Sequence, residues 1–256
     1  MVDLSKITKD GKALFLAYDQ GLEHGPVDFN DKSLDPGQIL KIGLYGEYTG
    51  MIVQKGIAEK YVVKAPFGEE LARKLPLIIK LNGKTNLITD EDPYSPPLCT
   101  VEEAISLGAV AVGYTIYVGS EHENKMTQEF AVVVREAHEK GIPVIGWMYT
   151  RGKGAEGKDK AELAAYAARI GLELGADIVK IKYPGSLEAL KLVVDMAGET
   201  KVVVSGGAKE AEETFLETAK VVMQSGAIGM AVGRNIWQDK DPLALTKKLK
   251  AVIFAS

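Results

Sequence analysis

The sequence predicts an α/β protein that forms a single-domain (β/α)8 TIM barrel over residues 1–256. Three observations lead to this prediction. Eight short apolar runs recur along the chain, and the segments between the later runs are amphipathic at spacings of three and four. No linker or low-complexity stretch divides the 256 residues. A doubly wound open sheet is the alternative, but such a sheet rarely needs eight evenly spaced units.

The predicted strands follow one another at regular intervals. The first four are KALFLAY (12–18), GMIV (50–53), PLIIKL (76–81) and AVAVGYTI (109–116). The last four are PVIGWMY (143–149), DIVKIKY (177–183), KVVVSGG (201–207) and GAIGMAVG (226–233). The helices predicted between the later strands are NKMTQEFAVVVREAHEKG, DKAELAAYAARIGLELGA, SLEALKLVVDMAG and KEAEETFLETAKVVMQSG. Each of them ends at or beside a glycine, which is typical of a helix C-terminus.

Composition restricts the class of protein. With 46% hydrophobic and 26% charged residues, the chain can bury a sizeable single core. The 35 acidic and 31 basic residues give a net charge of -4, which argues against nucleic acid as the main partner. The single cysteine, Cys99, excludes an internal disulfide and a multi-cysteine metal site. Because no signal segment or long apolar run is present, we expect a soluble cytoplasmic protein without a membrane partner.

Two lysines stand where a parallel barrel should be apolar. In ADIVKIKYPGS the period of two places Ile178, Lys180 and Lys182 on one strand face. Burial and a nearby second cation both disfavour the ammonium form, and so produce an amine able to form a Schiff base. Half-deprotonation near pH 7 needs the pKa to fall by about 3 units, or roughly 4 kcal/mol, through burial together with Lys182. The alternative is that both amines extend into solvent at the strand end.

Other strands also end in polar residues, and the active site of such a barrel lies at these C-terminal ends. These residues are Asp19 and Gln20 after the first strand, Trp147 and Tyr149 in the fifth, Ser205 in the seventh and Arg234 after the eighth. Tyr149 can exchange a proton if a nearby lysine lowers its phenol pKa, and Asp19 can orient the amine or a substrate hydroxyl. Separately, the tyrosine could simply pack its ring and the aspartate cap a turn.

A candidate phosphate site follows the last two strands. In SGGAKEAEE, Ser205, Gly206 and Gly207 precede a predicted helix start, where backbone amides and the helix dipole can hold an anion. Gly233 and Arg234 add a second element with a two-pronged cationic donor. One such element alone would more often be a turn, but two on consecutive strands favour phosphate binding.

The segment RGKGAEGKD imitates two nucleotide-binding motifs. It satisfies GxGxxG and nearly satisfies the P-loop pattern, but Asp159 replaces the hydroxyl that would hold magnesium. Asp177 has the spacing of a ribose-binding acid, yet the segment follows a fifth strand rather than opening the first βαβ unit. We expect instead a mobile loop whose Arg151 and Lys153 close over a second anionic group, or an ordinary solvated loop.

The three histidines are scattered, so neither a metal site nor a cofactor is expected. His24, in the glycine-flanked loop DQGLEHGP, is the one histidine predicted to lie at the active end. It could contact substrate or make an ordinary loop hydrogen bond.

The motifs together resemble the archaeal-type class I fructose-1,6-bisphosphate aldolases, the DhnA group. They are YDQGLEHGP, KLNGKTN, WMYTRGKG, ADIVKIKYPGS, VVVSGGAK and AVGRNIWQ, and they span nearly the whole chain in barrel order. The resemblance implies a Schiff-base lysine at Lys180, a proton-shuttling tyrosine at Tyr149 and an active-site aspartate at Asp19. It also implies that Ser205, Gly206, Gly207, Gly233 and Arg234 hold one substrate phosphate and that Arg151 with neighbouring loop residues serves the other. From their places at the active end of the barrel, Gln20, His24, Trp147 and Lys182 are further candidate substrate contacts.

The implied reaction is the reversible cleavage of fructose 1,6-bisphosphate to dihydroxyacetone phosphate and glyceraldehyde 3-phosphate, by a homo-oligomer that is a pentamer or decamer. The same family includes transaldolases similar to 2-amino-3,7-dideoxy-D-threo-hept-6-ulosonate synthase. These tend to carry a small residue where this chain has Glu23 and His24, so DQGLEHGP favours the aldolase. Gln20 departs from the Asp-His pair of some members. A non-catalytic sugar-phosphate-binding barrel would keep the glycines and Arg234 without needing Lys180 or Tyr149. Residues 89–97 have no assigned place.

Overall fold

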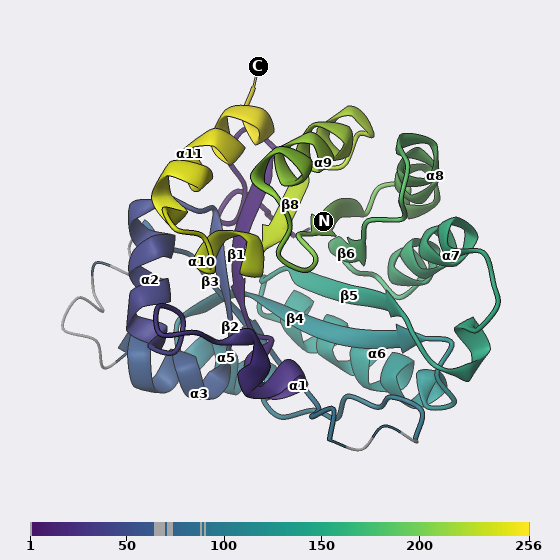
Figure 1. The fold of residues 1–256 in the computed structure, drawn as a ribbon. Coiled ribbons are helices and arrows are strands. Elements are labelled where there is room, and N and C mark those ends of the chain that lie inside the picture. The colour runs from purple at the N-terminus through teal and green to yellow at the C-terminus, as the bar shows by residue number, and fades with distance from the viewer. Residues whose placement is uncertain (1, 64–69, 71–73, 88, 90, 256) are drawn as a thin grey trace.

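The computed structural model describes residues 2–63, 70, 74–87, 89 and 91–255. Within these residues, eight parallel strands hydrogen-bond in chain order, and β8 pairs with β1 to close a barrel (Figure 1). The strands are β1 (Ala13–Tyr18), β2 (Gly50–Gln54), β3 (Leu77–Lys80), β4 (Ala109–Val118), β5 (Val144–Thr150), β6 (Ile178–Lys182), β7 (Lys201–Ser205) and β8 (Gly229–Val232). The predicted (β/α)8 barrel is therefore confirmed, and each of the eight apolar runs coincides with most or all of one strand.

Helices cover the outside of the barrel (Figure 1). Among the described residues, the α-helices of six residues or more are α2 (Pro36–Tyr45), α5 (Val101–Ser106), α6 (Glu123–Glu139), α7 (Lys160–Glu173), α8 (Leu187–Ala197), α9 (Glu212–Gln224) and α11 (Pro242–Ile253). Short helical turns also occur: α1 (Gly21–His24), η1 (Gly25–Asp28), α3 (Lys55–Ile57), η2 (Ala58–Val63), η3 (Lys153–Ala155) and α10 (Arg234–Trp237). Of these turns, α1, η3 and α10 follow the C-terminal ends of β1, β5 and β8, so they shape the mouth of the barrel.

Several helices begin at a side chain that accepts a hydrogen bond from the first turn. Asp35 caps α2, Ser186 caps α8 and Asp241 caps α11 in this way. Asp159 accepts from the backbone N–H groups of Ala161 and Glu162 and so caps α7. Each cap satisfies a donor that the helix itself leaves unpaired, which stabilises it by about 1 kcal/mol. Asp159 therefore has a structural role as a helix cap, which accounts for an aspartate at the position where a P-loop has a hydroxyl residue.

The interior of the barrel is filled by alternate residues of the strands. These are apolar at the lower levels: Phe15, Ile52, Ile78, Ala111, Ile145, Ile178, Val203 and Ala231. The opposite faces of the strands, with residues such as Leu14 and Leu16, pack against the helices. Following the same inward face towards the strand ends leads from Ile78 to Lys80 and from Ile178 to Lys180. Two lysines therefore enter the barrel just above its apolar core.

The segment around residues 91–97, which the sequence did not place, packs against the ends of β3 and β4. The Asn82 amide donates 2.9 Å hydrogen bonds to the carbonyls of Ser95 and Thr115. The Asp92 carboxylate accepts from the backbone N–H groups of Glu121 and Lys153. Positions 88 and 90 lie outside the described residues.

The glycine loop after β5 is held in place by several contacts. Its Gly154 N–H donates to the Gly119 carbonyl at 2.8 Å, and Lys153 is tied through its own N–H to Asp92. These hydrogen bonds hold the backbone of the loop against Gly119 and Asp92, and its closure over an anion stays a prediction.

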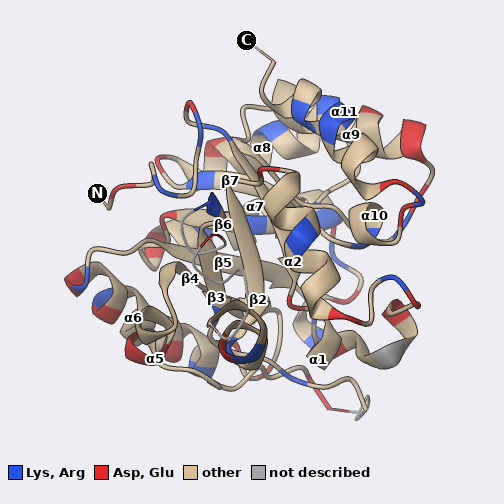
Figure 2. Cartoon of the chain, turned by 90° about the vertical axis from the view of Figure 1, so that its left-hand side faces the viewer, with Lys and Arg blue, Asp and Glu red and all other residues tan. Residues whose placement is uncertain are grey.

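Charges of both signs are interspersed over the helices of the face seen in Figure 2. Among the described residues, no helix combines the length and hydropathy that crossing a bilayer would require.

Candidate active site

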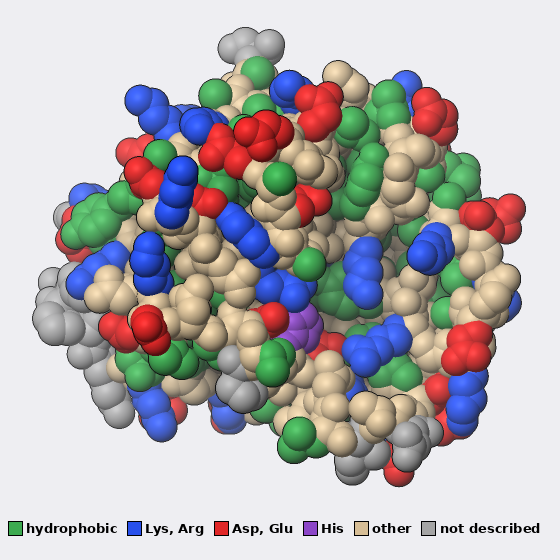
Figure 3. Space-filling model, in the orientation of Figure 1, with side chains coloured by type: hydrophobic (Ala, Val, Ile, Leu, Met, Phe, Trp, Pro, Cys, Tyr) green, Lys and Arg blue, Asp and Glu red, His purple; other side chains and the backbone are tan. Residues whose placement is uncertain are grey.

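A cavity of about 540 Å³ opens at the C-terminal ends of the strands. The face in Figure 3 is hollowed near its centre, with Lys and Arg side chains around the hollow. The cavity is lined by nearly all the predicted site residues: Asp19, Gln20, His24, Trp147, Tyr149, Lys180, Lys182, Ser205, Gly206, Gly207, Gly233 and Arg234. Arg151 is the exception, and it lines a neighbouring cavity with Lys84 and Asn86. The structure therefore brings most of the predicted site residues together in one cavity, and their roles stay a prediction.

Lys180 lies on the inner face of β6 with a side chain that is almost fully buried. Burial lowers the pKa of its amine from 10.5 to about 8; the Asp19 carboxylate opposes this fall, and the Lys80 ammonium adds to it. At pH 7 about one molecule in ten then carries the neutral amine, against about one in 3,000 for an ordinary lysine. Lys180 is thus suited to nucleophilic attack on a carbonyl.

The second cation in the site is Lys80, and not Lys182 as the sequence suggested. Lys80 is 3% exposed, and its Nζ lies 3.6 Å from Oδ2 of Asp19 and 4.0 Å from Oε2 of Glu23. Lys182 lies at the exposed rim, where its Nζ stands 5.5 Å from the centre of the Tyr149 ring. This difference follows from the strand period of two. Lys182 points to the same side as Lys180 but lies two residues further along β6, at the exposed end of the strand.

Asp19 is a buried carboxylate between two lysines. Burial alone would raise its pKa, but the Lys180 and Lys80 ammonium groups outweigh burial and hold that pKa below its ordinary value. Asp19 therefore stays ionised at neutral pH. It is placed to accept a proton or a hydrogen bond beside the amine.

Tyr149 has the opposite protonation preference. Burial raises the pKa of its phenol well above 10, and the Asp19 and Glu23 carboxylates add to the rise. The prediction that a lysine would lower this pKa was wrong, because burial and the two carboxylates act more strongly than the Ser205 hydroxyl and the Arg234 guanidinium, which lower it. Tyr149 is therefore neutral, and its chemistry begins with donation of a proton.

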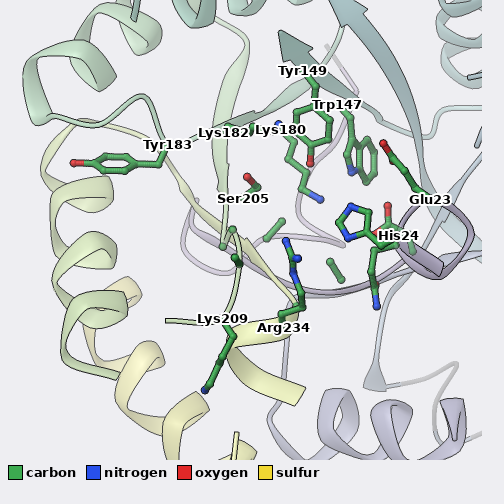
Figure 4. Close-up of a pocket in the computed structure, with 18 of the residues that line it drawn as sticks. Glu23, His24, Trp147, Tyr149, Lys180, Lys182, Tyr183, Ser205, Lys209 and Arg234 are labelled. Carbon is green, nitrogen blue, oxygen red and sulfur yellow. The ribbon is translucent and has the colours of Figure 1, made fainter. Parts of the chain in front are cut away.

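Trp147 forms one wall beside Lys180, whose Nζ lies 4.9 Å from the centre of the tryptophan ring (Figure 4). The ring occupies the space above Gly113 of β4, since a Cβ built on that glycine would lie 1.7 Å from Cζ3 of Trp147. The Trp147 indole N–H and the Gln20 amide nitrogen are buried and have no hydrogen-bond partner among the described residues. A buried donor in a cavity is satisfied when a ligand supplies an acceptor.

Glu23 ties three parts of the rim together. Its carboxylate accepts a hydrogen bond from the Tyr117 hydroxyl at 2.7 Å and pairs with Nη1 of Arg151 at 3.0 Å. Lys80 stands at 4.0 Å from the same carboxylate. Arg151 is thereby held between the main cavity, which Glu23 lines, and the neighbouring one.

The loops after β7 and β8 form an anion cradle. Gly207 has a φ of +72°, which a residue with a Cβ adopts only with strain. Within the described part of the chain, the backbone N–H groups of Gly207, Ala208 and Lys209 donate to no protein acceptor. Arg234 points into the cavity from the other side (Figure 4). Free amides with a guanidinium opposite them form a site of the kind that binds phosphate.

Asp28 links Arg234 with His24. Its carboxylate lies 3.4 Å from Nη1 of Arg234 and 2.5 Å from Nδ1 of His24. His24 makes the loop hydrogen bond that the sequence allowed and also lines the cavity, while its contact with substrate stays a prediction. Among the described residues, no group of three or more His, Cys, Asp and Glu side chains could hold a metal ion.

The arrangement thus brings a partly deprotonated lysine, an ionised carboxylate, a neutral tyrosine and an anion cradle to one cavity. A model of the DeoC/LacD family of aldolases matches residues 13–239 of the chain. The chain belongs to the DeoC/LacD aldolase family. Its resemblance to class I aldolases, predicted from six sequence motifs, is confirmed by the relatives described next.

This DeoC/LacD-family chain is 46% identical over 247 residues to the "Fructose-bisphosphate aldolase class 1" of Thermoproteus tenax, covering 95% of this chain and 90% of that one. A solved archaeal fructose-1,6-bisphosphate aldolase has its catalytic Lys covalently bound to the carbinolamine intermediate of the substrate. It superposes with a TM-score of 0.90 at 44% identity, covering 98% of each chain. The chain is also 32% identical over 251 residues to 2-amino-3,7-dideoxy-D-threo-hept-6-ulosonate synthase 1 of Archaeoglobus fulgidus, covering 98% and 89%.

One residue of this aldolase-family site was not predicted, and one residue considered from the sequence lies outside the site. Lys80 was missed although KLNGKTN contains it, because the inward parity that singled out Lys180 was not applied to the third strand. Asp177, considered as a ribose-binding acid, instead accepts from the Val144 N–H and lies 2.9 Å from Nε2 of His138. This position is at the N-terminal end of the barrel, which rules the residue out of the active cavity.

Proposed function

We propose that the protein is a class I aldolase that reversibly cleaves fructose 1,6-bisphosphate to dihydroxyacetone phosphate and glyceraldehyde 3-phosphate. The observation that carries this proposal is the buried Lys180 amine, with its pKa near 8, in a cavity shared with Asp19, Tyr149 and an anion cradle. The 46% identity to a class 1 aldolase supports the choice of substrate.

The neutral amine of Lys180 attacks the C2 ketone, and loss of water from the resulting carbinolamine gives an iminium ion. Removal of the proton from the C4 hydroxyl lets the C3–C4 bond break, and the bonding electrons move into the iminium to form an enamine. Glyceraldehyde 3-phosphate leaves. Protonation of the enamine at C3 and hydrolysis of the imine then release dihydroxyacetone phosphate and restore Lys180.

The protein groups divide this work by protonation state. Asp19, kept ionised by Lys180 and Lys80, accepts protons or orients the hydroxyl that loses one. Tyr149, kept neutral, donates a proton to the carbinolamine hydroxyl as water leaves. It regains a proton from the C4 hydroxyl, directly or through Asp19, as the C3–C4 bond breaks, and it then donates that proton to C3 of the enamine. The unpaired N–H of Trp147 and the amide of Gln20 can donate to substrate oxygens.

The two phosphates bind to separate groups of residues. Ser205, Gly206, Gly207, Gly233 and Arg234 bind one phosphate, and Arg151 binds the other from the neighbouring cavity. Lys182, exposed at the rim above Tyr149, adds positive charge along the path between them. His24 contacts the substrate from the loop after β1.

The second candidate is the transaldolase reaction of the hept-6-ulosonate synthase group, which would use the same lysine. The lower identity, 32% against 46%, and the rim carboxylate of Glu23 favour the bisphosphate aldolase. Glu23 fixes Arg151 at 3.0 Å, and this cation suits a substrate with a second phosphate. A binding protein without catalysis would gain nothing from a buried Lys180.

We further propose that the protein is a single-domain, cytoplasmic homo-oligomer, either a pentamer or a decamer.

The cleavage of fructose 1,6-bisphosphate by Lys180→Met, with Lys158→Met as the matched control, tests the function. Lys158 is an exposed lysine in the loop before α7, so its loss should leave the rate unchanged. Lys180→Met should remove cleavage. Cleavage that persists in Lys180→Met, or a wild-type protein that does not cleave this substrate, would overturn the proposal.

A further inference from the structure

We infer that Asn235 is a positioning residue that holds the phosphate-binding loop after β7 in its binding conformation. This inference rests on the proposed function and adds a residue that contacts neither the phosphate nor the reacting atoms. Asn235 follows Arg234 in α10 and is 1% exposed. It is not among the residues that line the cavity.

The side-chain amide of Asn235 donates both of its hydrogen bonds to the backbone of one loop. Its Nδ2 donates to the carbonyl of Gly206 at 2.7 Å and to that of Ala208 at 2.8 Å. Its Oδ1 accepts from the backbone N–H of Glu210 at 3.0 Å. These three bonds span residues 206–210, all of which line the cavity. Asn235 thus contacts this loop from the side away from the ligand.

These hydrogen bonds also determine the direction in which the backbone N–H groups of the loop point. In a planar trans peptide the C=O and the following N–H point in opposite directions. Because the carbonyls of Gly206 and Ala208 point at Asn235, the N–H groups of Gly207 and Lys209 point away from it. Those N–H groups have no protein acceptor among the described residues. Asn235 therefore turns the donors of the cradle away from itself and leaves them free for an anion.

A second contact secures the same loop from outside. The Lys209 ammonium donates to the Asn235 carbonyl at 3.0 Å and pairs with Asp239 at 2.6 Å. In Figure 4 the Lys209 side chain points away from Arg234 and Lys180. Although Lys209 follows directly after the glycines, its charge is used to anchor the loop rather than to contact the phosphate. The two halves of the cradle, after β7 and after β8, are thus joined mainly through Asn235.

No other side chain of similar size offers two N–H donors and a carbonyl. In Asn235→Asp, the new carboxylate would face two carbonyl oxygens and add negative charge behind the phosphate. In Asn235→Ser, the side chain becomes shorter and keeps only one donor, while its charge stays the same. Asn124→Asp is the matched control, because Asn124 is exposed on α6, far from the loop in sequence and fold.

The test compares two ketones that differ by the phosphate, using borohydride to trap the imine at Lys180. With dihydroxyacetone phosphate, we expect the half-saturating concentration to rise at least about tenfold in Asn235→Asp and less in Asn235→Ser, where tenfold is about 1.4 kcal/mol. With dihydroxyacetone, which lacks the phosphate, the trapping rate should stay within about twofold of wild type. The control should match wild type with both ketones.

Two outcomes would overturn the inference in variants that keep the wild-type melting temperature. One is an unchanged half-saturating concentration of dihydroxyacetone phosphate, and the other is an equal loss of imine trapping with both ketones.

The wild-type protein provides a further test that needs no variant. Peptide-level hydrogen exchange at 206–210 should slow when dihydroxyacetone phosphate or inorganic phosphate is added, and no slowing would count against the inference. A wild type that forms no imine with either ketone would instead refute the proposed function.

Discussion

Gly113 makes room for the tryptophan beside the nucleophilic lysine, so adding a single methyl group there should disable catalysis. In Gly113→Ala, the new Cβ would lie 1.7 Å from Cζ3 and 2.0 Å from Cη2 of Trp147. Non-bonded carbon atoms prefer separations of about 3.5–4.0 Å, so the ring must shift by about 2 Å. Trp147 is 1% exposed, and Lys180 Nζ stands 4.9 Å from its ring centre. Any shift therefore changes the wall against which the amine lies.

The expected magnitude follows from that displacement. A misplacement of about 1 Å can cost about 100-fold in rate, so we expect kcat for cleavage to fall at least about 100-fold. Overpacking of this kind also costs about 1–3 kcal/mol of folding free energy. The phosphate cradle lies on β7 and β8, away from β4, so KM should change much less than kcat.

The assay is steady-state cleavage together with single-turnover borohydride trapping, after a melting curve has shown that the variant is folded. Gly56→Ala is the control, because a Cβ at this exposed position in α3 would meet nothing within 4 Å. A folded Gly113→Ala protein that forms the imine at the wild-type rate would refute the reasoning that the ring position governs Lys180.

Two further predictions concern protonation. The rate of imine trapping should rise with pH to a half-maximum near the pKa of Lys180, about 8, because only the neutral amine attacks; below that pH it should fall about tenfold per unit. A trapping rate that is flat between pH 6 and pH 9 would contradict this assignment. In Lys80→Met, loss of the buried cation should raise the pKa of Lys180 and move the same half-maximum to higher pH. A midpoint that stays in place or moves to lower pH would show that Lys80 does not act on the amine.

The sequence was sufficient to predict the barrel and to bring most of the candidate residues to one cavity, largely because strand periodicity is a short-range property. Apolar runs of four to eight residues define strands, and the period of two then decides which side chains point inward. Lys180, Tyr149 and Asp19 could be grouped because each ends an inward series that is apolar below. The same rule applied to PLIIKLN would have identified Lys80, which is buried as deeply as Lys180.

Other features depend on contacts between distant segments, which periodicity does not reveal. Trp147 packs over Gly113, a residue 34 positions earlier in the chain whose partner in the sheet register is Ile145. Burial raises the pKa of Tyr149 first, and the Asp19 and Glu23 carboxylates, which the segment after β1 brings to the rim, raise it further. The bonds from Asn235 to residues 206–210 likewise join two loops that only the closed barrel sets side by side.

The central claim, that the Lys180 amine forms a covalent imine with a ketone substrate, is tested most directly by reductive trapping and peptide mapping. The wild-type protein is incubated with dihydroxyacetone phosphate and sodium borohydride, digested, and examined by mass spectrometry. We predict one substrate adduct per chain, on the peptide that contains ADIVKIKYPGS and at Lys180. An adduct at Lys80 or Lys182 in place of Lys180, or no adduct while cleavage proceeds, would contradict the account.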